Sequence, residues 1–167
     1  MKIGILSDTH GFLDEAIFNH FESCDEIWHA GDIGSVDIIE KLNDFKPLRA
    51  VYGNIDSHEI RQITGEDAWF TVEDCRIWMS HIGGAPPRYT PRIRKILEHK
   101  IPDIFICGHS HILRVEKDAA RRNMLFINPG AAGKHGFHHI RTIIRFDLNQ
   151  RKVENMQVIE LGKRASL

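Results

Sequence analysis

The sequence predicts an α/β fold in which two sheets pack together and helices lie outside them. The first half of the chain alternates short apolar runs with amphipathic helical patterns, which is typical of parallel strands joined by helical crossovers. The second half contains many closely spaced strand candidates, too many for one open sheet. Because no repeat, low-complexity tract or linker interrupts the 167 residues, we expect a single domain over residues 1–167.

The first half is predicted to contain three strands connected by two helices. The strands are Lys2–Ser7, Glu26–Ala30 and Leu48–Tyr52. Apolar residues recur at helical spacing over Leu13–Phe21, and again after Ser35, which we interpret as a helix N-cap. This order of elements predicts parallel pairing of the three strands.

The second half is predicted to open with a hairpin of Ala68–Val72 and Arg76–Ser80 around an acidic turn. A helix is expected over Pro91–Lys100, since proline is favoured at the first helical position. Five further strands are expected at Ile104–Cys107, Leu113–Glu116, Met124–Asn128, Thr142–Asp147 and Val153–Ile159, with a turn at Asp147–Gln150 between the last two.

Composition narrows the class of protein. Hydrophobic residues make up 42% and charged residues 27%, which is ordinary for a globular protein. A formal charge of -1 argues against a broad nucleic-acid or membrane surface. The three cysteines lack metal or disulfide spacing, no apolar stretch approaches the roughly 20 residues of a membrane span, and the apolar run at the N-terminus is too short for a signal peptide. We therefore expect a cytoplasmic protein.

Polar clusters follow five of the predicted strands. They are Asp8-Thr9-His10, His29-Ala30-Gly31-Asp32, Gly53-Asn54-Ile55-Asp56, the single His81, and Gly108-His109-Ser110-His111. Ligands of α/β sheets bind beyond the carboxyl ends of the strands, so these clusters should converge. The glycines at 31, 53 and 108 fit sharp exits at which backbone and ligand approach closely.

The converging side chains are carboxylates, imidazoles and one carboxamide, with no thiolate. This donor set suits Mn, Fe, Ni, Co or Zn ions better than a structural zinc site. The donors exceed what one ion needs, whereas two ions sharing a carboxylate would use them all. Each residue also has an ordinary interpretation by itself: Asp8 as a turn residue, Asp32 as a helix cap, Asn54 as a turn residue and His81 as a loop histidine.

The ordered motifs D-x-H at Asp8, G-D at Gly31, G-N at Gly53, His81 and G-H-x-H at Gly108 resemble the calcineurin-like metallophosphoesterase superfamily. More closely, the chain resembles the small YfcE-like phosphodiesterases. The resemblance spans about residues 2–147 and includes an N-P-G turn at residues 128–130.

This resemblance implies a four-layer α/β/β/α sandwich of two mixed sheets with outer helices. It also implies two divalent transition-metal ions, with Mn favoured. One ion would be held by Asp8, His10, Asp32 and His111, and the other by Asp32, Asn54, His81 and His109, so that Asp32 bridges. The implied reaction is hydrolysis of a small or medium phosphoester, in which a metal-bridging hydroxide attacks phosphorus. Asp32, Asn54 and His109 would then be catalytic.

Two positions depart from the wider superfamily. Many relatives have G-N-H, whose histidine is thought to protonate the leaving group, and here that position is Ile55. After His81 the chain reads Ile82-Gly83-Gly84 where many relatives continue G-H. The first departure favours phosphodiesters with acidic leaving groups over unactivated monoesters.

Further candidate residues lie near these motifs. Asp56 is a candidate catalytic residue that orients a ligand or water, or else caps a short helix through Ile60. Substrate contacts are predicted for Asn54, His29, Arg88 and His135, the last lying in the histidine-rich segment 134–139.

A protein of another class is the alternative. The same superfamily resemblance covers a retromer subunit that uses this fold as a protein-binding scaffold, and a homo-oligomer is also compatible with the sequence. A scaffold without catalysis predicts lost metal ligands, and none of the expected ligands is missing here.

Overall fold

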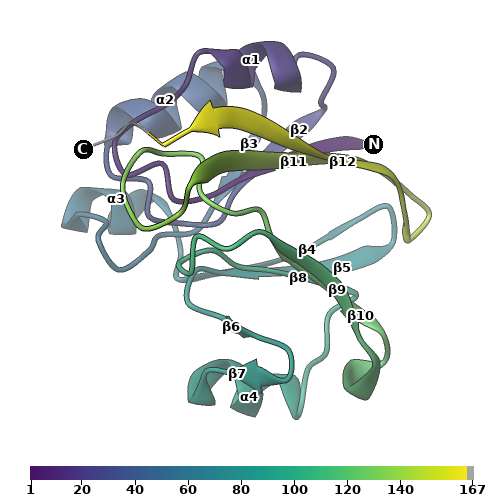
Figure 1. Cartoon of the computed structure of the whole chain (residues 1–167). Helices are drawn as coiled ribbons and strands as arrows, with labels where there is room; N and C mark the ends of the chain where they lie inside the picture. The colour runs from purple at the N-terminus through teal and green to yellow at the C-terminus, as the bar shows by residue number, and fades with distance from the viewer. Residues whose placement is uncertain (165–167) are drawn as a thin grey trace.

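The structure, a computed structural model, describes residues 1–164 and contains two five-stranded sheets packed face to face (Figure 1). The first sheet has the strand order β12-β11-β1-β2-β3. Its strands are β1 (Lys2–Leu6), β2 (Glu26–His29), β3 (Leu48–Ala50), β11 (Ile140–Asn149) and β12 (Lys152–Lys163). β1, β2 and β3 are parallel, as predicted, and β11 and β12 are added antiparallel at the edge.

The second sheet has the strand order β4-β5-β8-β10-β9. Its strands are β4 (Asp67–Val72), β5 (Cys75–Ser80), β8 (Ile104–Ile106), β9 (Arg114–Asp118) and β10 (Met124–Asn128). β5, β8 and β10 are parallel, while β4 and β9 pair antiparallel at the two edges. Both sheets are therefore mixed, and their parallel centres bring several carboxyl strand ends to one side of the molecule.

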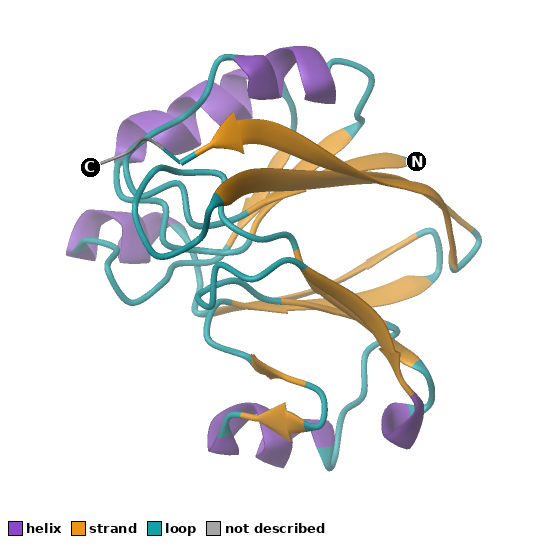
Figure 2. Ribbon diagram, viewed as in Figure 1, coloured by secondary structure: helices purple, strands orange, loops and turns teal. Residues whose placement is uncertain are grey.

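Helices cover the outer faces of the sandwich (Figure 2). They are α1 (Ala16–Phe21), α2 (Val36–Phe45), α3 (His58–Ile63) and α4 (Pro91–Leu97), with a short hairpin of β6 (Gly84–Ala85) and β7 (Arg88–Tyr89) and a 3-10 turn at Ala119–Arg121. α1 and α2 lie over the first sheet, and α4 lies beyond the second. The predicted four-layer α/β/β/α architecture is confirmed. Within residues 1–164, no helix has the length and apolar character needed to cross a membrane.

The core follows directly from the two-residue period of the strands. Ile3 and Ile5 of β1 face the second sheet, where they join Ile104 and Ile106 of β8 in one buried cluster. The intervening residues face the helices, and Phe105 packs with α4. Burying apolar side chains on both faces of the central strands stabilises them and fixes their register.

Several predicted boundaries were wrong by a few residues. α1 begins at Ala16 rather than Leu13, because the Asp14 carboxylate accepts a hydrogen bond from the Ala16 amide and Leu13 packs on the core from the preceding loop. α4 ends at Leu97 rather than Lys100. β11 continues to Asn149, so the turn into β12 falls at Gln150 and Arg151 instead of Asp147–Gln150.

Candidate metal centre

The loops that follow β1, β2, β5 and β8 meet at one end of the two sheets, at the left of Figure 1. They bring together two groups of side chains, and in each group one nitrogen or oxygen atom from every residue lies within 4.8 Å of the others. One group is Asp8, His10 and His111, and the other is Asp32, His81 and His109. His109 and His111, only two residues apart, thus belong to different groups.

Asp32 lies between the two groups. Its Oδ2 is 3.5 Å from His10 Nε2, and its Oδ1 is 3.2 Å from His81 Nε2. Asp8 Oδ1 is 3.2 Å from His111 Nε2, and the Nε2 atoms of His10 and His111 are 3.3 Å apart. One carboxylate oxygen therefore faces each histidine group, which is the arrangement that a shared carboxylate ligand requires.

His81 shows that this cluster fits cations. Its Nδ1 lies 2.8 Å from the Ala30 carbonyl oxygen, which can only accept a hydrogen bond, so Nδ1 carries a proton. In the neutral ring Nε2 then presents a lone pair, and this buried atom has no hydrogen-bond partner among residues 1–164. A buried lone pair facing carboxylates is unfavourable unless a proton or a metal ion lies between them.

The pKa values of the cluster reflect the same competition. Burial lowers the pKa of His81, but the close contact with Asp32 and the charges of Asp8 and Asp32 outweigh it, and the pKa lies above its ordinary value. Burial raises the pKa of Asp32, but contacts with His81 and the hydrogen bond from the Ile55 amide stabilise the ionised carboxylate more strongly. The pKa of Asp32 therefore lies below its ordinary value. Burial lowers the pKa of His10. Asp32 is therefore ionised at neutral pH, and protons compete with metal ions for His81.

The backbone of these loops is in an unusual conformation. Asp8, His10, Asp32, His109 and His111 all have positive φ, between 47° and 68°. For a residue other than glycine this conformation costs roughly 1 kcal/mol or more. The same conformation occurs in hairpin turns such as Glu73-Asp74, so what distinguishes these five residues is that they converge on one cluster.

Two glycines make room for this cluster. A Cβ on Gly53 would lie 2.0 Å from Asp32 Oδ1, and one on Gly108 would lie 2.7 Å from Asp8 Oδ2. Both contacts are too short for any side chain. The sequence predicts that the backbone lies close to the bound ligand at these glycines. In the structure, the groups next to the backbone there are the carboxylates of Asp32 and Asp8.

Asp56 holds the loops together instead of facing the cluster. Its buried carboxylate accepts hydrogen bonds from the Ile33, Gly34 and Gly53 amides at 3.1, 2.7 and 2.7 Å. The alternative of a helix cap is wrong, because Ser57 is the N-cap of α3 and accepts from the Ile60 amide. The predicted catalytic role of Asp56 is corrected to a structural one, since its oxygens are occupied by these amides.

The substrate contact predicted for His29 is also corrected. The side chain is 1% exposed, its Nε2 lies 3.0 Å from Thr9 Oγ1, and its Nδ1 accepts from the Gly31 amide. Burial lowers its pKa to about 4, so the ring is neutral and shielded from a substrate. His29 supports the β1 and β2 loops from behind the cluster.

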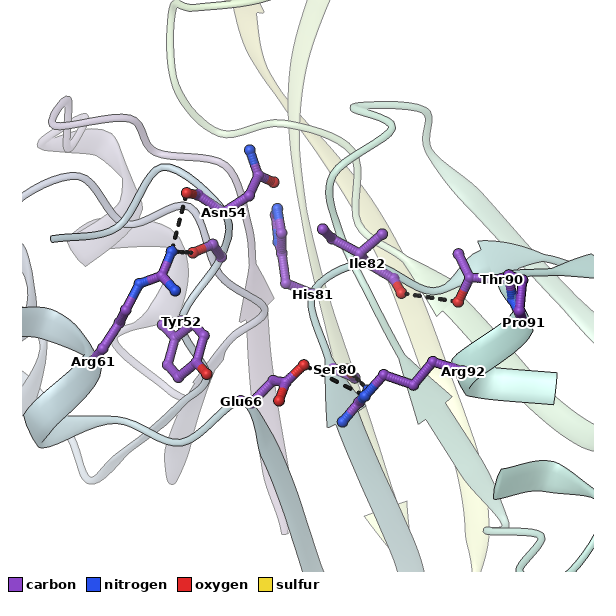
Figure 3. Close-up of a pocket in the computed structure, with 11 residues that line it drawn as sticks. Tyr52, Asn54, Arg61, Glu66, Ser80, His81, Ile82, Thr90, Pro91 and Arg92 are labelled. Atoms are coloured by element: carbon purple, nitrogen blue, oxygen red, sulfur yellow. Dashed lines mark hydrogen bonds and ion pairs between the residues drawn. The ribbon is translucent and has the colours of Figure 1, made fainter. Parts of the chain in front are cut away.

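A cavity of about 550 Å³ opens beside His81 (Figure 3). Figure 3 shows Asn54 next to the His81 ring, with Arg61 and Arg92 on opposite walls. The remaining lining residues are Tyr52, Gly53, Glu66, Ser80, Ile82, Thr90 and Pro91. Arg88, predicted as a phosphate contact, lies exposed on β7 and does not line this cavity.

Sequence reasoning missed the two arginines. Arg61 donates to the backbone carbonyls of Gly53, Asn54 and Asp56 at 3.3, 3.1 and 2.9 Å, and so holds the turn that presents Asn54. Arg92 is ion-paired with Asp67 and Glu66. Neither arginine belongs to a motif, and only the fold brings them to the cavity.

Two other predicted features lie where they can support the cluster. The Asn128 amide of the N-P-G turn donates to the Gly108 carbonyl at 2.8 Å and to Ser110 Oγ at 3.0 Å, so it holds the loop that carries His109 and His111. The exposed His135 ring lies 4.9 Å from the His10 ring, centroid to centroid. The predicted substrate contact of His135 stays a prediction.

The chain belongs to the calcineurin-like phosphoesterase superfamily, whose family model matches residues 1–151. It is 33% identical to a probable metallophosphoesterase of Methanothermobacter thermautotrophicus over 138 residues, 78% of this chain and 77% of that protein. It is 29% identical to a phosphodiesterase of Methanocaldococcus jannaschii over 147 residues, 78% of this chain and 83% of that protein. The resemblance inferred from the motifs is therefore confirmed.

The fold is shared with solved structures of low sequence identity. One is Vps29 of Entamoeba histolytica in complex with Zn²⁺, with a TM-score of 0.73 and 15% identity, covering 96% of this chain and 99% of that one. At this identity the likeness shows the fold alone.

Proposed function

We propose that this protein is a dinuclear metal-dependent phosphohydrolase with a preference for phosphodiesters. The observation that carries the proposal is that Asp32 joins the two side-chain groups. One of its carboxylate oxygens faces His10 of the first group, and the other faces His81 of the second. The proposed ligands are those expected from the sequence, including Asn54 beside His81. The name of the M. jannaschii relative supports the phosphodiesterase preference.

Two divalent ions bound here would supply an activated water at neutral pH and neutralise charge on the phosphoryl oxygens. The chain's own contribution is to hold the donors in place. Asp8 and Asp32 bring two negative charges, and the histidines must be neutral to bind metal. Two divalent cations therefore leave a net positive site, which favours an anionic phosphoester.

The cavity beside His81 is the proposed place for the organic group of the ester. Its volume of about 550 Å³ lies within the usual range for small-molecule sites. Tyr52 and Ile82 offer apolar surface, while Arg61 carries a positive charge bonded only to carbonyl oxygens among the described residues. Ile82 occupies the position after His81 where relatives differ, so it shapes the specificity of this chain.

The test begins with metal-free protein that is titrated with Mn²⁺, and then with Zn²⁺, Co²⁺, Ni²⁺ and Fe²⁺. Hydrolysis of bis-p-nitrophenyl phosphate is compared with that of p-nitrophenyl phosphate at each stoichiometry. We expect two equivalents of metal and faster hydrolysis of the diester. Binding of no more than one ion would contradict a dinuclear centre.

Metal binding alone does not separate an enzyme from a scaffold, because the Vps29 structure also contains Zn²⁺. Two bound ions without hydrolysis of either ester would favour the scaffold alternative. The proposal also includes a cytoplasmic, single-domain protein, with Mn²⁺ as the first metal to test.

A further inference from the structure

The histidine loop, residues 134–139, reaches the Asp8, His10 and His111 group from a distant part of the sequence. His138 lies in this loop and is half-buried. Its Nδ1 is 3.2 Å from His111 Nδ1, and its Nε2 is 3.0 Å from the Gly133 carbonyl oxygen. These two contacts determine where the protons of both rings lie.

The carbonyl oxygen of Gly133 can only accept a hydrogen bond, so the proton of neutral His138 must be on Nε2. His138 Nδ1 is then an acceptor, and its partner, His111 Nδ1, must donate. In the neutral ring His111 Nε2 then has no proton. Its lone pair is directed to Asp8 Oδ1 at 3.2 Å and to His10 Nε2 at 3.3 Å, where a cation would be bound.

We propose that His138 is a positioning residue that fixes the tautomer and orientation of His111 for metal binding. This inference rests on the proposed dinuclear function. Metal-binding histidines commonly donate their second ring N–H to an acceptor that keeps the other nitrogen free for the ion. Here the acceptor is a second histidine, itself held by a backbone carbonyl.

The two metal groups differ in how their histidines are held. His81 donates to the Ala30 carbonyl, which belongs to the backbone after β2 and is present whatever side chains surround it. His111 relies on the side chain of His138, which a substitution can remove without changing the main-chain donors and acceptors. The proposal therefore predicts an effect confined to the Asp8, His10 and His111 group.

The test uses three variants of His138 or its neighbour. His138→Leu fills a similar volume without an acceptor, and His138→Asn places an acceptor oxygen close to the position of Nδ1. His139→Ala is the matched control, because His139 is exposed and adjacent in the same loop. Thermal unfolding of the metal-free proteins checks that these three variants fold. A fourth variant, His138→Ala, serves as a second removal variant.

The first measurement is the tautomer of His111 in the metal-free protein, from long-range proton–nitrogen NMR correlations of the imidazole rings. We expect a proton on Nδ1 in the wild type and in His139→Ala. In His138→Leu the proton should move to Nε2, where Asp8 can accept it. A wild-type His111 protonated on Nε2 alone would overturn the proposal, and this result does not depend on whether the protein hydrolyses phosphoesters.

The second measurement is the affinity of the two sites for Mn²⁺, by calorimetric titration and by the electron paramagnetic resonance of coupled ions. His138→Leu should weaken one of the two sites by about 10–100-fold and leave the other unchanged. His138→Asn should restore part of the loss, and His139→Ala should behave as the wild type. Wild-type affinity at both sites in His138→Leu, or an equal loss in His139→Ala, would overturn the role assigned to His138.

Discussion

The buried His29 should make the stability of the metal-free protein depend on pH in a calculable way. Its pKa is about 4 in the folded chain, against an ordinary value near 6.5, because burial disfavours the charged ring. Between these two values the unfolded chain binds a proton that the folded chain does not. The free energy of unfolding therefore falls as the pH is lowered through this window, and the contribution of His29 becomes constant below about pH 4.

The magnitude follows from the size of the shift. Each pKa unit corresponds to about 1.36 kcal/mol, so the full shift is worth roughly 3 kcal/mol. Between about pH 7.5 and pH 5, only part of the window is crossed and the expected loss from His29 is about 2 kcal/mol. Because the side chain is 1% exposed, solvent screening does not reduce this figure strongly.

The assay compares urea unfolding of the wild type and His29→Gln in the presence of a chelator. Glutamine has an NH₂ group that can donate to Thr9 and a carbonyl oxygen that can accept from Gly31, as neutral histidine does with its two nitrogens, but it does not titrate. The difference in unfolding free energy between the two proteins should shrink by about 2 kcal/mol from about pH 7.5 to pH 5. Fluorescence of the buried Trp28 and Trp78 reports the transition.

His99→Gln is the control, since this exposed side chain is hydrated in both the folded and the unfolded chain. A difference between wild type and His29→Gln that stays constant over this range would refute the reasoning. It would mean that the folded protein accommodates a charged His29 without cost.

Three further predictions concern the metal centre. Asp32→Asn should abolish most activity and lower the metal content while the fold survives, and full activity with normal metal stoichiometry, measured by elemental analysis, would exclude a bridging role. His109→Ala and His111→Ala should each lose a different ion, because the two side chains belong to different groups, and anomalous scattering from crystals of both variants checks this. The rate of hydrolysis by the wild type should depend steeply on the pKa of the leaving group, because Ile55 has no proton to give and general-acid help is typically worth about 10²–10⁴-fold. The measurement is a series of aryl and alkyl esters hydrolysed by the wild type and by Ile55→His. A shallow dependence that Ile55→His leaves unchanged would mean that another residue supplies the proton.

The positions of most strands, and the parallel pairing of the first three, could be predicted because short apolar runs mark the strands and helical patterns separate the first three. Ile3 and Ile5 face one layer and Leu6 the other, a pattern that is visible without the structure. The convergence of Asp8, Asp32 and the histidines also followed from their places at strand ends. What the sequence does not contain is the direction of each side chain after its strand.

The remaining features depend on contacts between segments distant in sequence. Asp56 bonds the Ile33 amide 23 residues away, and His138 bonds His111 27 residues away. Neither contact has a local pattern, because the donors are backbone amides or a ring in another loop. The sequence predicts that Asp56 orients a ligand or water and that His29 contacts the substrate. Both side chains are buried and support the loops.

The loops and their supports together explain how protein contacts alone can hold the proposed metal donors in place. Left-handed backbone at Asp8 and Asp32 is held by hydrogen bonds between loops. The Asp8 amide donates to the Gly31 carbonyl, the Gly133 amide to the Asp8 carbonyl, and the His10 amide to the Asp32 carbonyl. Asp56 adds three bonds to the neighbouring turns. Because protein contacts hold the loops, binding of the proposed ions would not have to order them, and more of the binding free energy would appear as affinity. For the same reason, removing the metal should leave the backbone of these loops intact, since the contacts that hold it are protein contacts.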